Sequence, residues 1–325
     1  MTETKLPNIV LPAAFNYIAV FLTFACTLRC TYCINHHGGD LVKGRKLDGD
    51  DWIRGLNRLT AREDLPITIQ GGEPTVHRDF YKIVNGIRND THIDLLTNLE
   101  VDWAVFKSNI EHTRLKRNAP YASIRVSYHH GQSDFTKTIE RVSKLQESGF
   151  SIGIWEVGHP EYLGDVYKRQ SLAVQLGIDY RIKEFLGPHK GEVLGTFRYE
   201  EAVDSTSLRH CDCRTSELLI APDGGIFRCH SDLYANRYSV GHILDPNYTG
   251  ASLGQWSPCA VYGKCNSCDI KVKYDRFQKH GHSSVEIRNI SASHAKNTQY
   301  VTHVVNTYGK QDAIRTATYG KPVTT

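Results

Sequence analysis

The sequence lacks the features that would place the protein in a membrane, outside the cell or on nucleic acid. Its longest apolar run covers residues 17–24, far short of the roughly 20 residues that a bilayer-spanning helix needs. The first residues carry no basic-plus-apolar signal pattern. The net charge of +4 is small, and the 16 histidines are dispersed. We therefore expect a cytoplasmic protein, and we expect neither a membrane nor a nucleic acid as its partner.

Cysteine is absent from the whole central part of the chain, residues 34–210. The nine cysteines instead form two groups, and a core that used cysteine as a small apolar residue would scatter them. Without a secretion signal, this many cysteines indicates metal or redox chemistry, not disulfides. The first group is Cys26, Cys30 and Cys33; the second is Cys211, Cys213, Cys229, Cys259, Cys265 and Cys268.

The first group has the spacing Cys-x₃-Cys-x₂-Cys and directly follows the apolar run, which reads as a buried strand. Three thiolates on one loop can bind three corners of a [4Fe–4S] cluster. A cluster with three protein ligands leaves one iron open, and an open metal position can bind a substrate or cofactor. Zinc fits the spacing less well, because zinc sites usually pair two Cys-x₂-Cys turns, but the nearby His36 and His37 keep zinc as an alternative.

Apolar strand patterns alternate with amphipathic helix patterns from residue 17 to residue 185. The alternation predicts a parallel sheet with right-handed crossovers, either open or closed into a partial barrel. Strands are predicted over 17–24, 66–70, 92–96, 121–128, 150–157 and 178–185. Between them, helices are predicted after Asp48 or Asp50, Asp79, Asp102 and Ser133, and over 163–176.

Polar side chains and glycines follow these strands, where binding residues gather in both kinds of sheet. They belong to the cysteine loop, Gly71–Pro74, Asn98, Ser127–His130, Glu156 and Lys183–Glu184. The sequence therefore predicts one site along a shared edge of the sheet.

The pattern changes after about residue 187. A β-hairpin is predicted around Pro222–Gly225, with Cys213 just before it and Cys229 at its end. Beyond residue 285 the chain is polar and rich in threonine. We therefore divide the chain into an N-terminal arm (1–15), an α/β domain (16–186), a small C-terminal domain (187–285) and a polar tail (286–325).

The cysteine loop, with Tyr32 before its last cysteine, and the turn Gly71-Gly72-Glu73-Pro74 one strand later together resemble the radical S-adenosylmethionine (SAM) superfamily. The resemblance implies a partial (β/α)₆ TIM-like barrel. It also implies that the glycine turn holds the methionyl amine of SAM, while the amine and carboxylate chelate the open iron. Glycine allows close backbone approach to a ligand, and Glu73 adds a carboxylate suited to an ammonium group.

The same resemblance implies the cofactors and their chemistry. They are a [4Fe–4S] cluster with an open iron and SAM, with electrons supplied by a donor such as flavodoxin or ferredoxin. Reductive cleavage of SAM then gives a 5′-deoxyadenosyl radical that takes a hydrogen atom from the substrate. For contacts with SAM we expect Tyr32, Asn98, Ser127 and Lys183 beside Gly71, Gly72, Glu73 and Pro74. Asn98 could instead be only a helix cap, and Ser127 and Lys183 only polar residues at strand ends.

For substrate binding or proton handling we expect Glu156, His129 and His130. Paired histidines are also common as solvated loop residues, so this role has a plain structural alternative.

The second cysteine group resembles the SPASM/twitch extension of radical SAM enzymes. Cys213, Cys229, Cys265 and Cys268 match the shorter arrangement, which binds one auxiliary [4Fe–4S] cluster, and Cys211 or Cys259 could replace one of the four. The resemblance thus implies a small β-hairpin/helix iron–sulfur domain, with a zinc site as the alternative.

Three functions remain open from the sequence. The first is a peptide-modifying enzyme that oxidises, epimerises or crosslinks a precursor. The second is a small-molecule enzyme that dehydrogenates or rearranges an alcohol, sugar or nucleotide. The third is a non-catalytic iron–sulfur redox protein, which the intact Gly71–Pro74 turn argues against.

Overall fold

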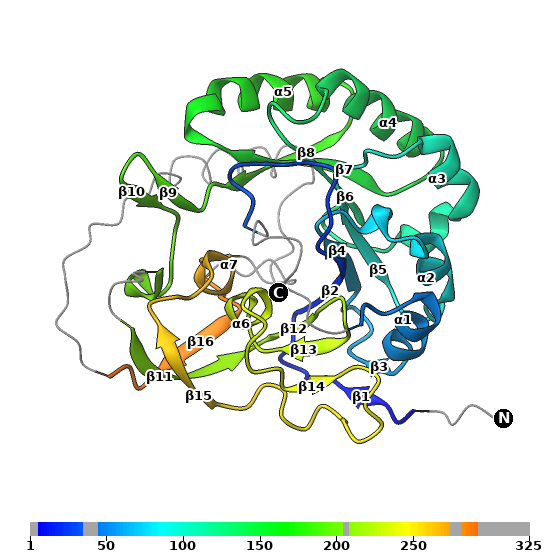
Figure 1. Ribbon diagram of the computed structural model, residues 1–325. Helices are drawn as coiled ribbons and strands as arrows, with labels where there is room; N and C mark the ends of the chain where they lie inside the picture. Colours follow the sequence, from blue (N-terminus) through cyan, green and yellow to red (C-terminus); the bar gives the residue numbers. More distant parts are fainter. Residues whose placement is uncertain (1–5, 35–44, 204–207, 274–280, 292–325) are drawn as a thin grey trace.

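The computed structural model describes residues 6–34, 45–203, 208–273 and 281–291, and it is organised around one nine-stranded sheet (Figure 1). The strand order is β14-β13-β12-β2-β4-β5-β6-β7-β8. Every pair from β12 to β8 is parallel, and the β13 and β14 pairings are antiparallel. The parallel strands from the α/β region are β2 (Tyr17–Thr23), β4 (Ile67–Gly71), β5 (Ile93–Thr97), β6 (Ile124–Tyr128), β7 (Ile152–Gly158) and β8 (Asp179–Glu184).

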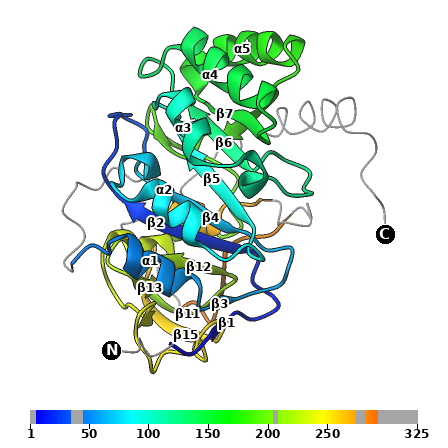
Figure 2. The ribbon, with the colours of Figure 1, turned by 90° about the vertical axis from the view of Figure 1, so that its right-hand side faces the viewer.

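Five helices lie between these strands along the chain. They are α1 (Gly49–Leu56), α2 (Phe80–Gly86), α3 (Trp103–Asn109), α4 (Phe135–Glu147) and α5 (Leu163–Gln175). Figure 1 shows them along the outer side of the curved sheet, and Figure 2 shows that they follow one another in chain order. The predicted α/β fold with a mostly parallel central sheet is confirmed, and its curvature is consistent with a partial barrel.

The helix starts follow side-chain caps, with one difference from the prediction. Asp48 caps α1 by accepting a hydrogen bond from the Asp51 amide, as expected for one of the two predicted caps. The prediction that Ser133 caps α4 is wrong, because Asp134 accepts the hydrogen bond from the Lys137 amide at 3.2 Å. The Ser133 hydroxyl is buried and has no hydrogen-bond partner among the residues that the structure describes.

The apolar run 17–24 explains why β2 lies inside the sheet. Ile18, Val20 and Leu22 pack into the large core beneath the helices. Ala19 and Phe21 point to the other face, where Phe227 and residues of α6 (His230–Tyr234) cover them. Strands of parallel sheets are often buried on both faces, so a continuous apolar run is favoured over strict alternation.

The predicted hairpin forms, and it also extends the main sheet. It consists of β12 (Glu217–Ile220) and β13 (Gly225–Phe227), and β12 pairs in parallel with β2. The division of the chain at residue 187 stays a prediction. The structure adds that this part of the C-terminal region shares a sheet with the α/β region.

The remaining elements are short and lie mainly in the C-terminal region. A three-stranded sheet has the order β15-β11-β16, and two helices, α6 and α7, lie near it (Figure 1). The bounds are β11 (Arg209–Thr215), β15 (Ser257–Tyr262), β16 (Val285–Arg288), α6 (His230–Tyr234), α7 (Ser267–Ile270), β14 (Gly241–His242), β9 (Gly187–His189), β10 (Glu192–Leu194), β1 (Ile9–Val10) and β3 (Leu59–Thr60). The short 3₁₀ turns are Pro74–Val76, His112–Leu115, Pro160–Tyr162 and Glu200–Val203.

Some predictions fall on parts of the chain that the structure does not describe. His36 and His37, the first residues of the arm and most of the predicted tail lie outside the described residues. Among the residues described, no helix has both the length and the apolar composition that crossing a bilayer requires.

Candidate active site

One cavity of about 840 Å³ collects most of the predicted site residues at the carboxyl ends of the parallel strands. This placement follows from the topology, because parallel strands end at the same edge. The predicted residues in its wall are Cys26, Cys30, Tyr32, Cys33, Gly71, Gly72, Asn98, Ser127, His129, Glu156, Lys183 and Cys268. The predicted residues outside its wall are Glu73, Pro74, His130, Cys211, Cys213, Cys229, Cys259 and Cys265.

The three-cysteine loop leaves β2 and borders this cavity. Cys30 is buried and Cys33 is exposed. Burial is the main cause that raises the pKa of the Cys30 thiol to about 11, and the neighbouring Cys33 and Cys26 sulfurs contribute to the rise. Thiols gathered in this way suit a metal cluster, because the iron of the cluster binds the thiolate form and supplies positive charge. The donor set therefore fits the iron–sulfur cluster implied by the sequence.

Backbone hydrogen bonds connect the glycine turn to the cysteine loop. The Gly72 amide donates to the Thr23 carbonyl and the Glu73 amide to the Ala25 carbonyl, each at 2.8 Å. A Cβ atom on Gly72 would lie 2.3 Å from the Ala25 carbonyl oxygen, and one on Gly71 would lie 2.1 Å from that of Thr23. The two segments approach so closely that only glycine fits at both positions.

The Glu73 carboxylate has a different environment from the one that an ammonium ligand would need. It is 1% exposed and does not line the cavity. One oxygen accepts from the Thr75 amide (3.1 Å) and from the Thr75 and Thr97 hydroxyls (2.7 Å each), and the other accepts from the Asn98 amide (2.6 Å). Burial raises the pKa of this carboxyl, and these donors counteract the rise. Glu73 thus connects the ends of β4 and β5, and any contact of the turn with SAM would come from its backbone.

Asn98 connects the end of β5 with the cysteine loop. Its amide nitrogen donates to the Thr27 hydroxyl at 2.9 Å and lies 3.9 Å from the Cys26 sulfur. Its side-chain oxygen accepts from the Glu100 amide at 2.9 Å. The helix-cap alternative is wrong, because Asp102 caps α3 by accepting from the Ala104 and Val105 amides. The assignment of Asn98 to SAM stays a prediction.

Aromatic rings line the side of the cavity that contains Tyr32. Tyr32 stacks on His129 with ring centroids 6.2 Å apart, and it lies 5.8 Å from His159. Burial lowers the pKa of His129 to about 4, and the nearby Lys183 contributes to the lowering. At neutral pH the His129 ring is therefore uncharged, and its protonation would cost free energy. His130 stacks on Tyr162 at 4.0 Å instead and stays outside the cavity wall.

Glu156 lines the cavity, but its carboxylate is already paired. Arg169 donates to both of its oxygens, at 3.0 and 2.6 Å, and the Tyr180 hydroxyl also donates to it. Glu156 is 2% exposed. The bidentate pair and the Tyr180 hydroxyl fix this carboxylate between β7, α5 and β8, so its predicted role in proton handling would require the pair to open.

Sequence reasoning missed the positive side chains that share the cavity with Lys183. Burial is the main cause that lowers the pKa of Lys183 to about 7, and the nearby Lys271 and Arg125 contribute to the lowering. Arg125 lies in β6 and Lys271 follows α7, and both line the cavity. The only signal in the sequence is that Arg125 interrupts an otherwise mainly apolar strand.

The second cysteine group is compact but differs from the expected set. The sulfurs of Cys211, Cys213 and Cys259 all lie within 4.8 Å of one another, and those of Cys211 and Cys213 are 3.5 Å apart. Cys211 and Cys213 are two residues apart on β11, and Cys259 faces Cys211 on β15. Cys265 lies near enough to Cys211 and Cys259 that they raise its pKa, together with burial and Asp269.

Cys229 and Cys268 take different positions. Cys229 lies near Cys265, whereas Cys268 lines the main cavity beside Lys183. The chemistry of the compact group fits a thiophilic metal, and the identity of its fourth ligand stays a prediction.

Comparison with known proteins agrees with the family that the cysteine loop and the glycine turn resemble. The family model for the "Radical SAM superfamily" matches residues 20–160. PqqA peptide cyclase of Bradyrhizobium diazoefficiens is 25% identical over 165 residues, which are 49% of this chain and 42% of that protein. GTP 3′,8-cyclase of Edwardsiella ictaluri is 33% identical over 88 residues, which are 25% of this chain and 26% of that protein. The matches thus span less than half of either relative.

A solved structure shares the overall fold. It is that of native anSMEcpe with bound AdoMet and the Kp18Cys peptide, with a TM-score of 0.50 and 16% identity. The match covers 74% of this chain and 78% of that one. Residues 20–160, which contain the cysteine loop and the glycine turn, are thus similar to a radical SAM superfamily domain.

Proposed function

We propose that the protein is a radical SAM enzyme that acts in peptide modification. When bound, the [4Fe–4S] cluster and SAM supply reductive cleavage to a 5′-deoxyadenosyl radical, which takes a hydrogen atom from the substrate. The observation that carries the proposal is the joining of the three-cysteine loop to the Gly71–Gly72 turn at one cavity. A redox protein that holds no SAM has no need for this close approach.

The side chains of the cavity would have the following tasks. Cys26, Cys30 and Cys33 would hold the cluster. Tyr32 would pack against the adenine of SAM, and the glycine turn would present its backbone to the methionyl amine. The uncharged His129 would border the reacting atoms, where a dry and aromatic surface protects a radical from water.

The match to a peptide cyclase supports a peptide as the substrate. The match to GTP 3′,8-cyclase supports the alternative, a small-molecule substrate. A short precursor peptide encoded beside the gene would distinguish the two. Incubation with that peptide should change its mass only in the presence of SAM and reductant, whereas an unchanged peptide would favour the small-molecule alternative.

Cleavage of SAM is the direct test of the proposed activity. Anaerobically reconstituted protein with dithionite, in place of a flavodoxin or ferredoxin donor, should release 5′-deoxyadenosine from SAM. Cys30→Ala should release none, because a buried cluster ligand is lost. Thr31→Ala, at an exposed position of the same loop, should behave like the wild type. If the reconstituted wild type cleaves no SAM, the protein is a non-catalytic iron–sulfur protein instead.

We also propose one auxiliary [4Fe–4S] cluster in the second cysteine group, with the compact Cys211, Cys213 and Cys259 among its ligands. Two clusters require about eight irons and eight sulfides per chain. About four irons together with about one zinc would indicate the zinc alternative.

A further inference from the structure

Three cations of the main cavity lie close together without a matching set of anions. Arg125 comes from β6, Lys183 from the end of β8 and Lys271 from the segment after α7. All three line the cavity, and both Arg125 and Lys271 lie close enough to Lys183 to disfavour its charged form. Like charges that meet in a partly buried wall repel one another, so the arrangement gains from a bound anion.

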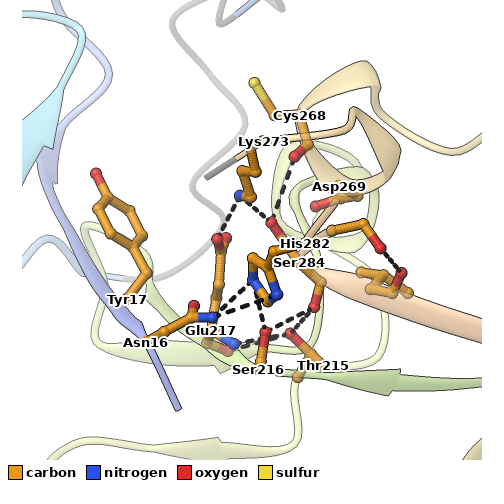
Figure 3. Close-up of polar contacts among 12 residues, drawn as sticks. Asn16, Tyr17, Thr215, Ser216, Glu217, Cys268, Asp269, Lys273, His282 and Ser284 are labelled. Atoms are coloured by element: carbon orange, nitrogen blue, oxygen red, sulfur yellow. Dashed lines mark hydrogen bonds and ion pairs between the residues drawn. The ribbon is translucent and has the colours of Figure 1, made fainter. Parts of the chain in front are cut away.

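The lysines of this cluster have no partner within the described part of the chain. Neither Lys183 nor Lys271 makes an ion pair or a side-chain hydrogen bond there, and both are half-buried. Lys273, two residues further on, provides the contrast. It pairs with Glu217 and donates to the Ser284 hydroxyl, in the polar network that Figure 3 shows.

Arg125 is only partly neutralised. Its nearest carboxylate, Asp94, is shared with Arg117, which donates to both Asp94 oxygens at 2.9 and 2.8 Å. Arg125 reaches Asp94 at 3.3 Å with one terminal nitrogen, and its buried Nε has no hydrogen-bond partner in the part of the chain that the structure describes. One carboxylate therefore faces two guanidinium groups, and a net positive charge remains.

The other carboxylates of the cavity have partners of their own. Glu156 pairs with Arg169, and Glu217 pairs with Lys273. Glu184 accepts from the Thr196 amide and hydroxyl at 2.7 and 2.8 Å with one oxygen, and its other oxygen has no hydrogen-bond partner among the described residues. Lys271 lies near enough to counteract the rise that burial causes in the pKa of this carboxyl. This one carboxylate faces two lysines and the partly neutralised Arg125, so the net charge of this part of the wall is positive.

We propose that Arg125, Lys183 and Lys271 form a subsite that binds an anionic group of the substrate, a carboxylate or a phosphate. Guanidinium and ammonium groups are the side chains that bind both anions by charge-assisted hydrogen bonds. The subsite rests on the proposed function, because it shares the cavity with the cysteine loop. In this proposal Lys183 contacts the substrate. The alternative is that Lys183 binds the carboxylate of SAM, as expected from the sequence.

The test measures anion binding apart from catalysis. Reconstituted protein with SAM bound is titrated anaerobically with inorganic phosphate and with glutarate, and binding is followed by calorimetry. The wild type should bind at least one of the two, and the tighter one identifies the substrate anion as phosphate or carboxylate. Lys271→Gln should weaken that binding about tenfold, as expected for a lost charged hydrogen bond of roughly 1.4 kcal/mol. Lys183→Gln should weaken it at least as much.

Two controls make the outcome specific. Lys271→Arg keeps the charge and should keep most of the affinity, and Lys107→Gln, at an exposed position of α3, should match the wild type. Lys271→Gln should also leave the Kd for SAM within about twofold of the wild type. Equal losses of SAM and anion affinity would assign the cations to SAM and overturn the proposal, as would a wild type that binds neither anion. A failure of the proposed function would appear separately, as absent 5′-deoxyadenosine with anion binding intact.

Discussion

Single residues of the site are constrained by contacts that differ in kind from one position to the next. Glycine is required at position 72 because a Cβ atom there would collide with the cysteine loop. Glu73 is required by hydrogen bonds that join two strand ends. His129 is held uncharged by burial and by a neighbouring cation. None of these constraints needs a ligand to be present, so each can be tested on its own.

We expect Gly72→Ala to weaken both the fold and SAM binding. Its Cβ would lie 2.3 Å from the Ala25 carbonyl and 2.5 Å from that of Phe24, so the cysteine loop must move. Overpacking of this kind costs about 1–3 kcal/mol of unfolding free energy. Urea unfolding and equilibrium binding of SAM provide the measurements. Gly164→Ala is the matched control, since its Cβ would meet nothing within 4 Å; equal behaviour of the two variants would contradict the steric argument.

We expect the unfolding free energy of the protein to fall in mild acid because of His129. Its pKa is about 4 in the folded state, against 6.5 for an unperturbed histidine side chain. Between these values the unfolded chain binds a proton that the folded chain does not, so the unfolding free energy falls as the pH falls from about 6.5 towards 4. From pH 7.5 to 5.5 the loss from this group is about 1 kcal/mol.

The measurement is anaerobic urea unfolding at both pH values. His129→Gln should lose less stability than the wild type over this interval, by about that amount. His210→Gln, at an exposed position, should follow the wild type. An identical pH dependence of wild type and His129→Gln would show that this ring is not buried uncharged.

At the scale of elements, polar contacts join neighbouring strands and helices of the central sheet. Glu156 of β7 accepts hydrogen bonds from Arg169 of α5 and from Tyr180 of β8. Asp94 of β5 accepts a hydrogen bond from Arg125 of β6. Asn98, after β5, donates a hydrogen bond to Thr27 of the cysteine loop. These contacts lie at or near the cavity, so the stability of the wall and the shape of the site depend on the same side chains.

We expect Arg169→Met to destabilise the protein strongly. It leaves the buried Glu156 carboxylate without its cation, and breaking a buried pair in this way costs about 3–5 kcal/mol. The double variant Glu156→Gln/Arg169→Met should recover much of this loss, because no buried charge remains. Lys168→Met, at an exposed neighbouring position, should change little. Thermal and urea unfolding report the result; a single variant as stable as the wild type would refute a stabilising pair.

Sequence periodicity predicted the strands and helices well, but it predicted only part of the strand pairings. Continuous apolar runs such as 17–24 identify buried strands, because the run itself reports burial on both faces. The cap of α4 differed by one residue, since Ser133 and Asp134 are both good caps and backbone geometry selects Asp134. The pairing of β12 with β2 was not predicted, because it joins segments about 200 residues apart and leaves no local pattern.

For the whole molecule, the C-terminal segments complete the cavity that the parallel strands begin. Lys271, Lys273 and Cys268 reach its wall, and the pairing of β12 with β2 brings that region beside the parallel strands. The network of Asn16, Glu217 and Lys273 in Figure 3 joins the start of β2 to this region. The two cysteine groups therefore belong to one continuous structure, with separate positions in it.

We expect the second cysteine group to bind its metal through Cys259 but not through Cys268. Cys259 lies within 4.8 Å of two other sulfurs, whereas Cys268 lines the main cavity. Because metal-binding free energy adds to folding free energy, Cys259→Ala should lose the second metal and lower the Tm. Iron, sulfide and zinc analysis with calorimetry measures both effects. Cys268→Ala should retain the metal; its loss there would instead support the ligand set predicted from the sequence.

The sequence by itself determined the order of strands and helices, the three-cysteine loop and the glycine turn, because each depends on residues close together in the chain. Only the tertiary structure decided that Glu73 turns away from the cavity, that Glu156 is paired, and that Arg125 and Lys271 meet Lys183. The physical reason is that burial and charge pairing depend on which strands become neighbours. In this protein that choice is made by contacts between segments far apart in the chain, and it is these contacts that shape the site.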